Sequence, residues 1–301
     1  GSHLLEEFGK DGGYKLFSFD KTSPEFERKG VEEIREDFSD FSKTLETFQK
    51  IRPDIMVHLG ALPSVQMSVK EPVKTYDVNI KGTYNVLEAA RLCGARRFVF
   101  SSSAAVYGYT AEEHSGEPLK ENLPLRPKNP YGLAKKMGEE MLALWSGNKF
   151  WQGIDTVSLR FFNVFGPRQK RDSAYATAIE RFLYQWKNNE PLTIVPPGTQ
   201  KRDMVYVKDL VKAVKAAALS PKEFQGMAIN IGSGKNYSIL EIADVIGGKN
   251  YPRVEIEPRP GDVKEVLADT SLARDMLKWQ AETEFEAGIE QVKKYVKDSK
   301  L

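Results

Sequence analysis

The sequence has little cysteine and histidine, and it has no apolar run long enough to cross a membrane. Its single cysteine, Cys93, excludes an intramolecular disulfide, and three histidines leave little for a zinc site. No segment approaches the roughly 20 apolar residues of a transmembrane helix, and the N-terminus has no signal-peptide pattern. The net charge is only +2, from 44 basic and 42 acidic side chains, so no strong field favours nucleic acid or anionic membranes. We therefore expect a cytoplasmic protein without a metal, a nucleic-acid partner or a membrane partner.

Short apolar strands alternate with amphipathic helices through the first half of the chain. Residues 14–19, 54–59, 97–101 and 156–161 resemble strands, and a helix after Pro72 places Tyr76, Ile80, Tyr84, Leu87 and Ala90 at steps of three or four. This alternation predicts an α/β fold with a parallel sheet wrapped by helices. After Gly166 the elements become shorter, and Ser238 with Glu241 indicates a capping box that opens a helix.

The change in character at this point predicts two domains. Residues 1–165 form a nucleotide-binding domain, and residues 166–301 form a smaller domain that binds the substrate and whose chain crosses back to the first. We expect the active site between the two domains.

Tyr131 and Lys135 stand four residues apart, and the run Ser101 to Gly108 precedes them by about 28 positions. On a helix, residues at this spacing share a face, so an ammonium can lie beside a phenol while a hydroxyl from another element approaches. A tyrosine that works as a base at neutral pH needs its pKa lowered by about three units, roughly 4 kcal/mol, and a close cation can supply this. The alternative is an ordinary pair on a helix surface.

Asp20 ends the first strand-like segment, where ligands of open parallel sheets bind. A carboxylate there can accept both hydroxyls of an adenosine ribose and repel a 2′-phosphate, which favours NAD over NADP. Gly1 lies about 19 positions earlier, near the spacing between a dinucleotide glycine fingerprint and its ribose acid. The fingerprint itself is not in the sequence, so the first strand and the earlier glycines are predicted to be missing. A tag remnant is the competing explanation for the residues that begin the chain.

With these motifs in order, the chain resembles the extended short-chain dehydrogenase/reductase group. Within that group it is similar to NAD-dependent nucleotide-sugar epimerases of the UDP-glucose or UDP-N-acetylglucosamine 4-epimerase type. The resemblance covers nearly the whole chain, and its fold is a Rossmann-like doubly wound parallel sheet. The matching segments are Gly1 to Leu4, Asp37-Phe38, His58-Leu59-Gly60-Ala61-Leu62, Asn79 with Gly82-Thr83, Ser101 to Gly108, Asn129 to Lys135, Arg160 to Pro167, Arg202-Asp203 with Val207 and Asp209, and Arg259-Pro260-Gly261-Asp262.

The resemblance implies a role for each matching site residue. Tyr131 is the acid/base, Lys135 binds the nicotinamide ribose and lowers the pKa of Tyr131, and Ser103 bonds the reacting sugar hydroxyl. Further contacts with NAD are implied for Gly1, Asp20, Asp37, Phe38, Leu59, Ala61, Asn79 and Phe161. Contacts with a UDP-sugar are implied for Ser64, Asn163, Arg202, Arg259 and Asp262. The alternative for Arg202 and Arg259 is a surface ion pair with Asp203 or Asp262. A homodimer is expected by family analogy.

The residues after Ser103 bear on the type of reaction. Dehydration needs an additional acid and base, and related dehydratases carry Thr-Asp-Glu where this chain has Ser103-Ala104-Ala105. Alanine side chains can act neither as the acid nor as the base, which argues against dehydration. We therefore expect reversible oxidation at C4, rotation of the 4-keto sugar and its reduction on the other face. The rivals are a UDP-glucuronate 4-epimerase or decarboxylase, a 4-ketoreductase, and a non-catalytic binding protein with the same fold.

Overall fold

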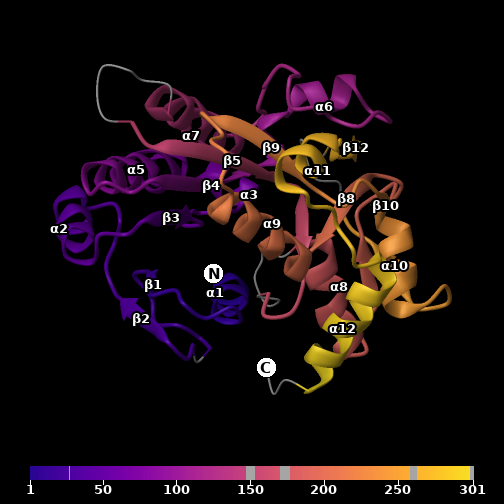
Figure 1. The fold of residues 1–301 in the computed structure, drawn as a ribbon. Helices are drawn as coiled ribbons and strands as arrows, with labels where there is room; N and C mark the ends of the chain where they lie inside the picture. The colour runs from indigo at the N-terminus through magenta and orange to yellow at the C-terminus, as the bar shows by residue number, and fades with distance from the viewer. Residues whose placement is uncertain (27, 147–152, 170–176, 258–262, 299–301) are drawn as a thin grey trace.

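Four parallel strands form the central sheet of the computed structural model, which describes residues 1–26, 28–146, 153–169, 177–257 and 263–298. The strands are β3 (Ile55–His58), β4 (Arg97–Ser103), β5 (Asp155–Phe161) and β9 (Met227–Ile231), in the order β3-β4-β5-β9. Three of them lie where the sequence predicted strands. The predicted α/β fold is therefore confirmed, with a parallel sheet at its centre (Figure 1).

Helices cover both faces of this sheet, because its buried strands carry apolar side chains on both sides. Phe98 and Phe100 of β4 pack with α2 (Phe41–Ile51), α5 (Gly82–Leu92) and α7 (Pro130–Ser146). Val99 points to the opposite face, toward α1 (Ser2–Gly9), α9 (Val207–Leu219) and α11 (Ser271–Leu277). In Figure 1, α5 and α7 lie above the sheet, and α1 and α9 lie below it.

A second parallel pair, β1 (Leu16–Phe19) and β2 (Val31–Ile34), forms its own sheet beside α1. Among the described residues, no ladder of hydrogen bonds joins this pair to β3. In a doubly wound sheet of order 3-2-1-4, the first strand lies between the second and the fourth. The missing first strand stays a prediction.

The helix predicted after Pro72 is three segments, α4 (Pro72–Tyr76), a π-helical turn η1 (Asp77–Lys81) and α5. The π-helical turn rotates the residues after it relative to a continuous α-helix. The predicted apolar residues therefore do not all lie on one face. Leu87 and Ala90 are buried, whereas Tyr84 is 40% exposed. π-Turns of this kind occur often at functional sites, and this one contains Asn79.

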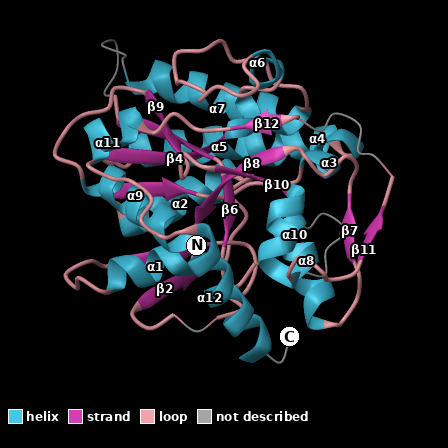
Figure 2. Ribbon diagram, turned by 90° about the vertical axis from the view of Figure 1, so that its right-hand side faces the viewer, coloured by secondary structure: helices cyan, strands magenta, loops and turns pink. Residues whose placement is uncertain are grey.

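The C-terminal part has a core of its own, built on short sheets (Figure 2). β8 (Lys201–Tyr206) pairs with β6 (Asn163–Phe165), β10 (Asn236–Ser238) and β12 (Glu265–Val266), and β7 (Leu192–Ile194) pairs with β11 (Arg253–Glu255). Its helices are α8 (Ala178–Lys187), α10 (Ile239–Gly247) and α12 (Phe285–Asp298). The capping box of Ser238 and Glu241 is present at α10.

The division at residues 165 and 166 stays a prediction, and both α9 and β9 beyond it belong to the central layers. Three short segments complete the described structure: α3 (Val65–Lys70), the 3₁₀ turn η2 (Ala104–Val106) and α6 (Tyr109–Glu113).

Within the described ranges, no helix has the length and apolar character needed to cross a bilayer.

Candidate active site

The carboxyl ends of the central strands meet at one edge, which is where open parallel sheets bind their ligands. Ser103, the last residue of β4, is the register partner of Phe161, the last residue of β5. β4 then turns into η2, and the Ser103 hydroxyl accepts a hydrogen bond from the Ala105 N–H at 3.2 Å. Two predicted site residues, one catalytic and one for the cofactor, therefore lie side by side.

Helix α7 brings Tyr131 to the same edge. Its first turn is capped by the Asn129 side chain, which accepts from the Gly132 N–H at 2.8 Å. A Cβ on Gly132 would lie 2.5 Å from the Ala105 carbonyl oxygen, so the absence of a side chain lets the helix approach η2 this closely. The close approach places Tyr131 in hydrogen-bond contact with Ser103.

Lys135 follows one turn later and is buried. Its ammonium donates to the Ser101 carbonyl at 2.6 Å, lies 4.6 Å from the Phe100 ring centroid and lies 5.9 Å from the Tyr131 ring centroid. Burial lowers the pKa of Lys135 to about 7, and the charge of Glu139 opposes this shift.

The pKa of Tyr131 differs from the sequence-based expectation. Burial raises this pKa, and only the hydrogen bond with Ser103 opposes the rise. Lys135 was expected to lower it, but the ammonium of Lys135 is directed to the Ser101 carbonyl. The catalytic side chains are thus together, whereas the electrostatic effect expected of the lysine is not present in this arrangement.

The predicted adenosine side of the cofactor site is open. Asp20 follows β1 and is exposed, and its carboxylate accepts from the Thr22 N–H at 2.9 Å and the Thr22 hydroxyl at 2.8 Å. Asp37 is exposed, 3.7 Å from the Lys21 ammonium, and a hydrogen bond from the Ser39 N–H lowers its pKa. A hollow of about 340 Å³ is lined by Lys21, Arg35, Glu36, Asp37, Asp40 and Lys43.

Gly1 stands immediately before α1, and its carbonyl accepts from the Leu5 N–H at 3.1 Å. The N-terminal end of a helix attracts anions such as phosphate, because its first N–H groups have no partner within the helix. Gly1 is therefore placed as the last glycine of a phosphate loop would be.

Phe38 and Asn79 shape the loop after β3 rather than standing free in the site. The Phe38 ring packs edge-on against His58, and a Cβ on either Gly60 or Gly82 would lie within 2.7 Å of the ring. The buried Asn79 amide accepts from the Leu62 N–H at 2.7 Å and donates to the Leu62 carbonyl at 3.1 Å. Leu59 and Ala61, both partly buried, lie in the loop that these contacts hold.

The predicted substrate residues fall into two groups. Asn163 donates to the Asp203 carbonyl at 3.0 Å, which places it beside Arg202, whose guanidinium donates to the Lys201 carbonyl at 2.7 Å. Ser64 caps α3 and accepts from the Met67 N–H at 3.1 Å. Arg259 and Asp262 lie outside the described residues.

The carboxylate of Asp203 is buried and is bound by backbone N–H groups. It accepts from the N–H groups of Ser233, Gly234 and Ala268, at 2.7, 3.0 and 3.1 Å. The alternative in which Asp203 forms a surface ion pair with Arg202 is therefore not the arrangement found.

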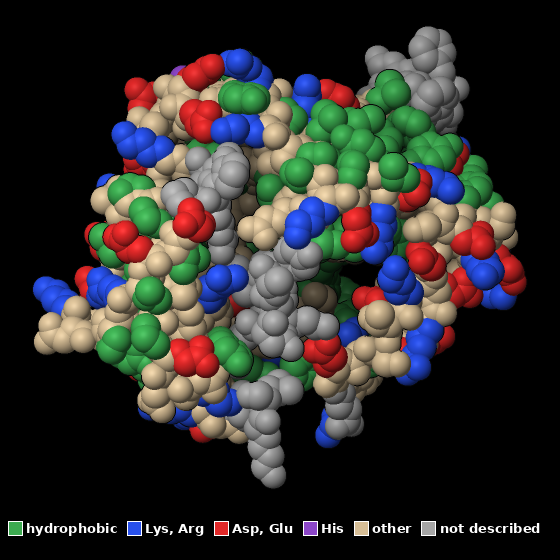
Figure 3. Space-filling model, turned by 180° about the vertical axis from the view of Figure 1, so that it is seen from behind, with side chains coloured by type: hydrophobic (Ala, Val, Ile, Leu, Met, Phe, Trp, Pro, Cys, Tyr) green, Lys and Arg blue, Asp and Glu red, His purple; other side chains and the backbone are tan. Residues whose placement is uncertain are grey.

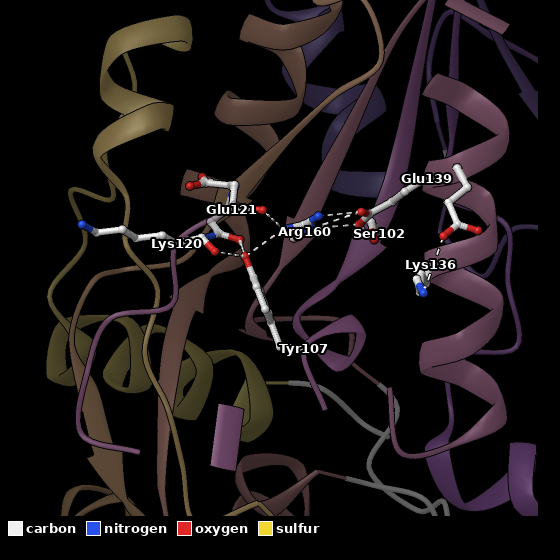
Figure 4. A network of polar contacts seen from close by, with 9 residues as sticks. Ser102, Tyr107, Lys120, Glu121, Lys136, Glu139 and Arg160 are labelled. Atoms are coloured by element: carbon white, nitrogen blue, oxygen red, sulfur yellow. Dashed lines mark hydrogen bonds and ion pairs between the residues drawn. The ribbon is translucent and has the colours of Figure 1, made fainter. Parts of the chain in front are cut away.

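Sequence reasoning missed Glu139, Arg160 and Tyr107, which form a buried polar network (Figure 4). One signal was available: Tyr131, Lys135 and Glu139 repeat every four residues, so they share one face of α7. Arg160 was noted only as the start of a matching segment. Among the described residues, no group of three or more His, Cys, Asp or Glu side chains is arranged to hold a metal.

The polar groups described above fit a dinucleotide. A helix N-terminus at Gly1 suits a phosphate, and the exposed carboxylate of Asp20 suits ribose hydroxyls. Tyr131 and Lys135 lie at the carboxyl end of the sheet, where the reactive end of a cofactor belongs.

Comparison with known proteins shows the family of the chain. The chain is 32% identical over 305 residues to a UDP-glucose 4-epimerase of Lactobacillus helveticus, covering 94% of this chain and 89% of that protein. A UDP-glucose 4-epimerase from Thermotoga maritima, solved with UDP-glucose, superposes with a TM-score of 0.91 at 28% identity, covering 99% and 95% of the two chains. A UDP-N-acetylglucosamine 4-epimerase from Methanobrevibacter ruminantium gives 0.87 at 31% identity, covering 98% and 94%. Residues 1–232 match the family model, and the chain belongs to the NAD dependent epimerase/dehydratase family.

Proposed function

We propose that the protein is an NAD-dependent nucleotide-sugar 4-epimerase, acting on UDP-glucose and UDP-galactose or on the corresponding N-acetylated pair. The observation that carries this proposal is the contact between Ser103 and Tyr131 at the strand ends, with Lys135 one turn further along α7. Ala104 and Ala105 follow Ser103, so those two positions hold no acid or base for dehydration.

In this proposal Tyr131 takes the proton of the sugar 4-hydroxyl, and Ser103 bridges the two oxygens. NAD, held by Lys135 and Asp20 among the residues named below, would supply the redox chemistry at C4, which is reversible hydride transfer. Asn163, Arg202 and Arg259 hold the diphosphate while the 4-keto sugar turns to its other face, and Tyr131 then returns the proton. Arginine suits this role because it stays charged and binds phosphate oxygens with two hydrogen bonds.

The raised pKa of Tyr131 means that neighbouring groups must stabilise its phenolate for it to act as a base. Because burial raises that pKa, the phenolate needs stabilisation at neutral pH, and Ser103 and a charged Lys135 are the groups near Tyr131, among the described residues, that we propose to provide it. Asp20, Asp37, Phe38, Leu59, Ala61, Asn79 and Phe161 bind or position the cofactor in this proposal, together with Gly1 and Lys135. Ser64 and Asp262 contact the substrate.

Replacing Tyr131 tests the assignment. Tyr131→Phe removes the acid/base oxygen and keeps the ring, so we expect turnover to be lost while UDP-sugar binding is kept. Turnover is measured as UDP-galactose formed from UDP-glucose, with UDP-N-acetylglucosamine and UDP-glucuronate as further substrates. Calorimetry measures binding, and a fully active variant would contradict the role of Tyr131.

A second measurement separates epimerisation from net redox chemistry. The purified protein is denatured, released NAD(H) is quantified, and NADH is followed during turnover. An epimerase returns each hydride to the sugar and therefore accumulates no NADH, whereas a reductase consumes it. Absence of both cofactor and turnover would favour the non-catalytic alternative.

We also propose a homodimer through the outer face of α5 and α7, where hydrophobic side chains gather (Figure 3). A hollow of about 520 Å³ lies there, and Val73 on the adjacent α4 is 74% exposed. The hollow is lined by Tyr76, Asp77, Ile80, Lys81, Tyr84, Leu133, Met137 and Met141. Two helices side by side in each copy allow a self-complementary four-helix contact. The cytoplasmic location stays a prediction.

A further inference from the structure

Glu139 joins α7 to two strands of the central sheet (Figure 4). Its carboxylate accepts a short hydrogen bond from the Ser102 hydroxyl on β4. It also receives Arg160 of β5, whose Nε and Nη2 lie 3.0 Å from Oε1 and 2.7 Å from Oε2. Ser102 and Arg160 are register partners across the two strands. One carboxylate is therefore bound by neighbouring residues of two strands at once.

The other end of Arg160 is equally well bound. Its Nη1 donates to the Tyr107 hydroxyl at 2.9 Å and to the Glu121 carbonyl at 3.0 Å, and the Tyr107 hydroxyl donates to the Asn230 side chain at 2.8 Å. Burial opposes the charged form of Arg160, but its bonds to Glu139 raise its pKa overall. The ion pair is thus fully hydrogen-bonded, which is the condition for a buried pair to persist.

Lys135 and Glu139 contact consecutive residues of β4. Lys135 donates to the Ser101 carbonyl, and Glu139 accepts from the Ser102 hydroxyl. Both side chains are almost fully buried, with 2% and 7% exposed, and they stand one turn apart on the same face of α7. A buried ammonium with a carboxylate one turn away is stabilised in its charged form.

No other described element supplies Lys135 with a compensating negative charge. From β3 the buried His58 lies close to Lys135, and burial lowers the pKa of His58 to about 3, so it is neutral. Arg160 on β5 is a cation and supplies no negative charge. Tyr131 on α7 is a neutral phenol, because its pKa is raised. Asp77 and Lys81 line the hollow on the outer, solvent-facing side of α7.

We propose that Glu139 is a positioning residue that keeps Lys135 charged and directed to the strand ends, while Ser102 and Arg160 fix Glu139 in place. The inference rests on the proposed function only for the role of Lys135 in turnover. Without Glu139, Lys135 and Arg160 are two buried cations with no carboxylate between them. Lys135 then loses its proton at a lower pH, so the charged form that the proposed phenolate needs during turnover is present over a narrower pH range.

The first test is the pH dependence of kcat for Glu139→Gln. Gln keeps the size and an acceptor for Ser102 but removes the charge. We expect the alkaline limb, where Lys135 deprotonates, to move to lower pH by roughly one unit or more, with KM for the UDP-sugar unchanged. Glu140→Gln is the matched control, because Glu140 is the next residue, is exposed and pairs only loosely with Lys136 at 3.6 Å. A uniform loss of kcat with an unshifted limb would mean that Glu139 is merely structural.

The second test does not depend on activity. The folded pKa of Lys135 is about 7 and its ordinary value is 10.5. Between these values the unfolded chain binds a proton that the folded chain lacks, so Lys135 makes stability rise with pH across this window. Subtracting the profile of Lys135→Met isolates this contribution. In Glu139→Gln the rise should begin at lower pH, and in Glu140→Gln it should begin where it does in the unaltered protein.

A double variant covers the case in which Glu139→Gln does not fold. Glu139→Gln with Arg160→Met removes both charges of the buried ion pair, so that Arg160 is not left without its carboxylate, and proteins often tolerate such a replacement. The earlier onset of the stability rise should persist in this variant, and an onset equal to that of the unaltered protein overturns the proposal. If the unaltered protein has no epimerase activity, the function proposed above fails, while the stability profiles still decide the role of Glu139.

Discussion

The Ser103 hydroxyl serves both the backbone and the reaction site. It accepts from the Ala105 N–H, which fixes the turn after β4, and it bonds Tyr131, which opposes the raised pKa of that phenol. At this scale the sequence was informative, because Tyr131 and Lys135 were noted from their spacing and Ser103 from the family resemblance. The direction of the Lys135 ammonium was not predictable, since it depends on the carbonyl of Ser101.

Ser103→Ala should affect kcat more than binding. Loss of the hydrogen bond raises the pKa of Tyr131 further, so the acid limb of the kcat profile should move to higher pH. We expect kcat at neutral pH to fall by roughly 100-fold, a usual effect for one proton-transfer group. Ser103→Thr keeps the hydroxyl and should restore most of the activity. A profile for Ser103→Ala that coincides with that of the unaltered protein would exclude Ser103 from the proton path.

Helix α7 is positioned by its glycines as much as by its apolar residues. A Cβ on Gly132 would lie 2.5 Å from the Ala105 carbonyl, and a Cβ on Gly138 would lie 2.6 Å from the Phe100 ring. Both glycines let the helix lie close to β4 and η2. The distance between Tyr131 and Ser103 is therefore set by backbone approach, which the apolar pattern of the helix does not reveal.

Gly132→Ala should separate α7 from η2. The added methyl group meets backbone that has little room to move, so we expect the free energy of unfolding to fall by about 1–3 kcal/mol. kcat should fall as well, because Tyr131 moves away from Ser103. Gly9→Ala is the control, since a Cβ there meets nothing within 4 Å and the residue lies in a helix. Denaturant unfolding and kcat are measured for both variants, and equal results for the two would contradict this account.

The elements differ in how far the sequence could predict them. Strands β3, β4 and β5 and the Ser238 cap were predictable, because alternating apolar runs and capping residues are local signals. The π-turn at Asp77–Lys81 was not, since it depends on the bonds of Asn79 with Leu62 on another segment. The Glu139–Arg160 pair was missed for the same reason: it joins residues 21 positions apart that only the folded sheet brings together.

At the scale of the whole molecule, the apolar outer face of α5 and α7 predicts association. Met137→Glu places a charge in the hollow on this face, where burial without a partner is costly. We expect the unaltered protein to have about twice the 34.0 kDa mass of the chain in light scattering, and the variant to have the single mass. Val254→Glu, an exposed change on β11, should leave the mass unaltered. A monomer before any substitution would refute the dimer.

The two ends of strand β4 have different roles, one in stability and one in the proposed reaction. At its start, the buried Arg97 pairs with Asp155 at 2.7 Å and donates to the carbonyls of Ala217 and Lys222, which ties α9 and the following loop to the sheet. At its far end stands Ser103. The residues that stabilise the fold and the residue proposed to react are therefore at opposite ends of one strand. Stabilising substitutions near Arg97 should leave the activity at Ser103 unchanged.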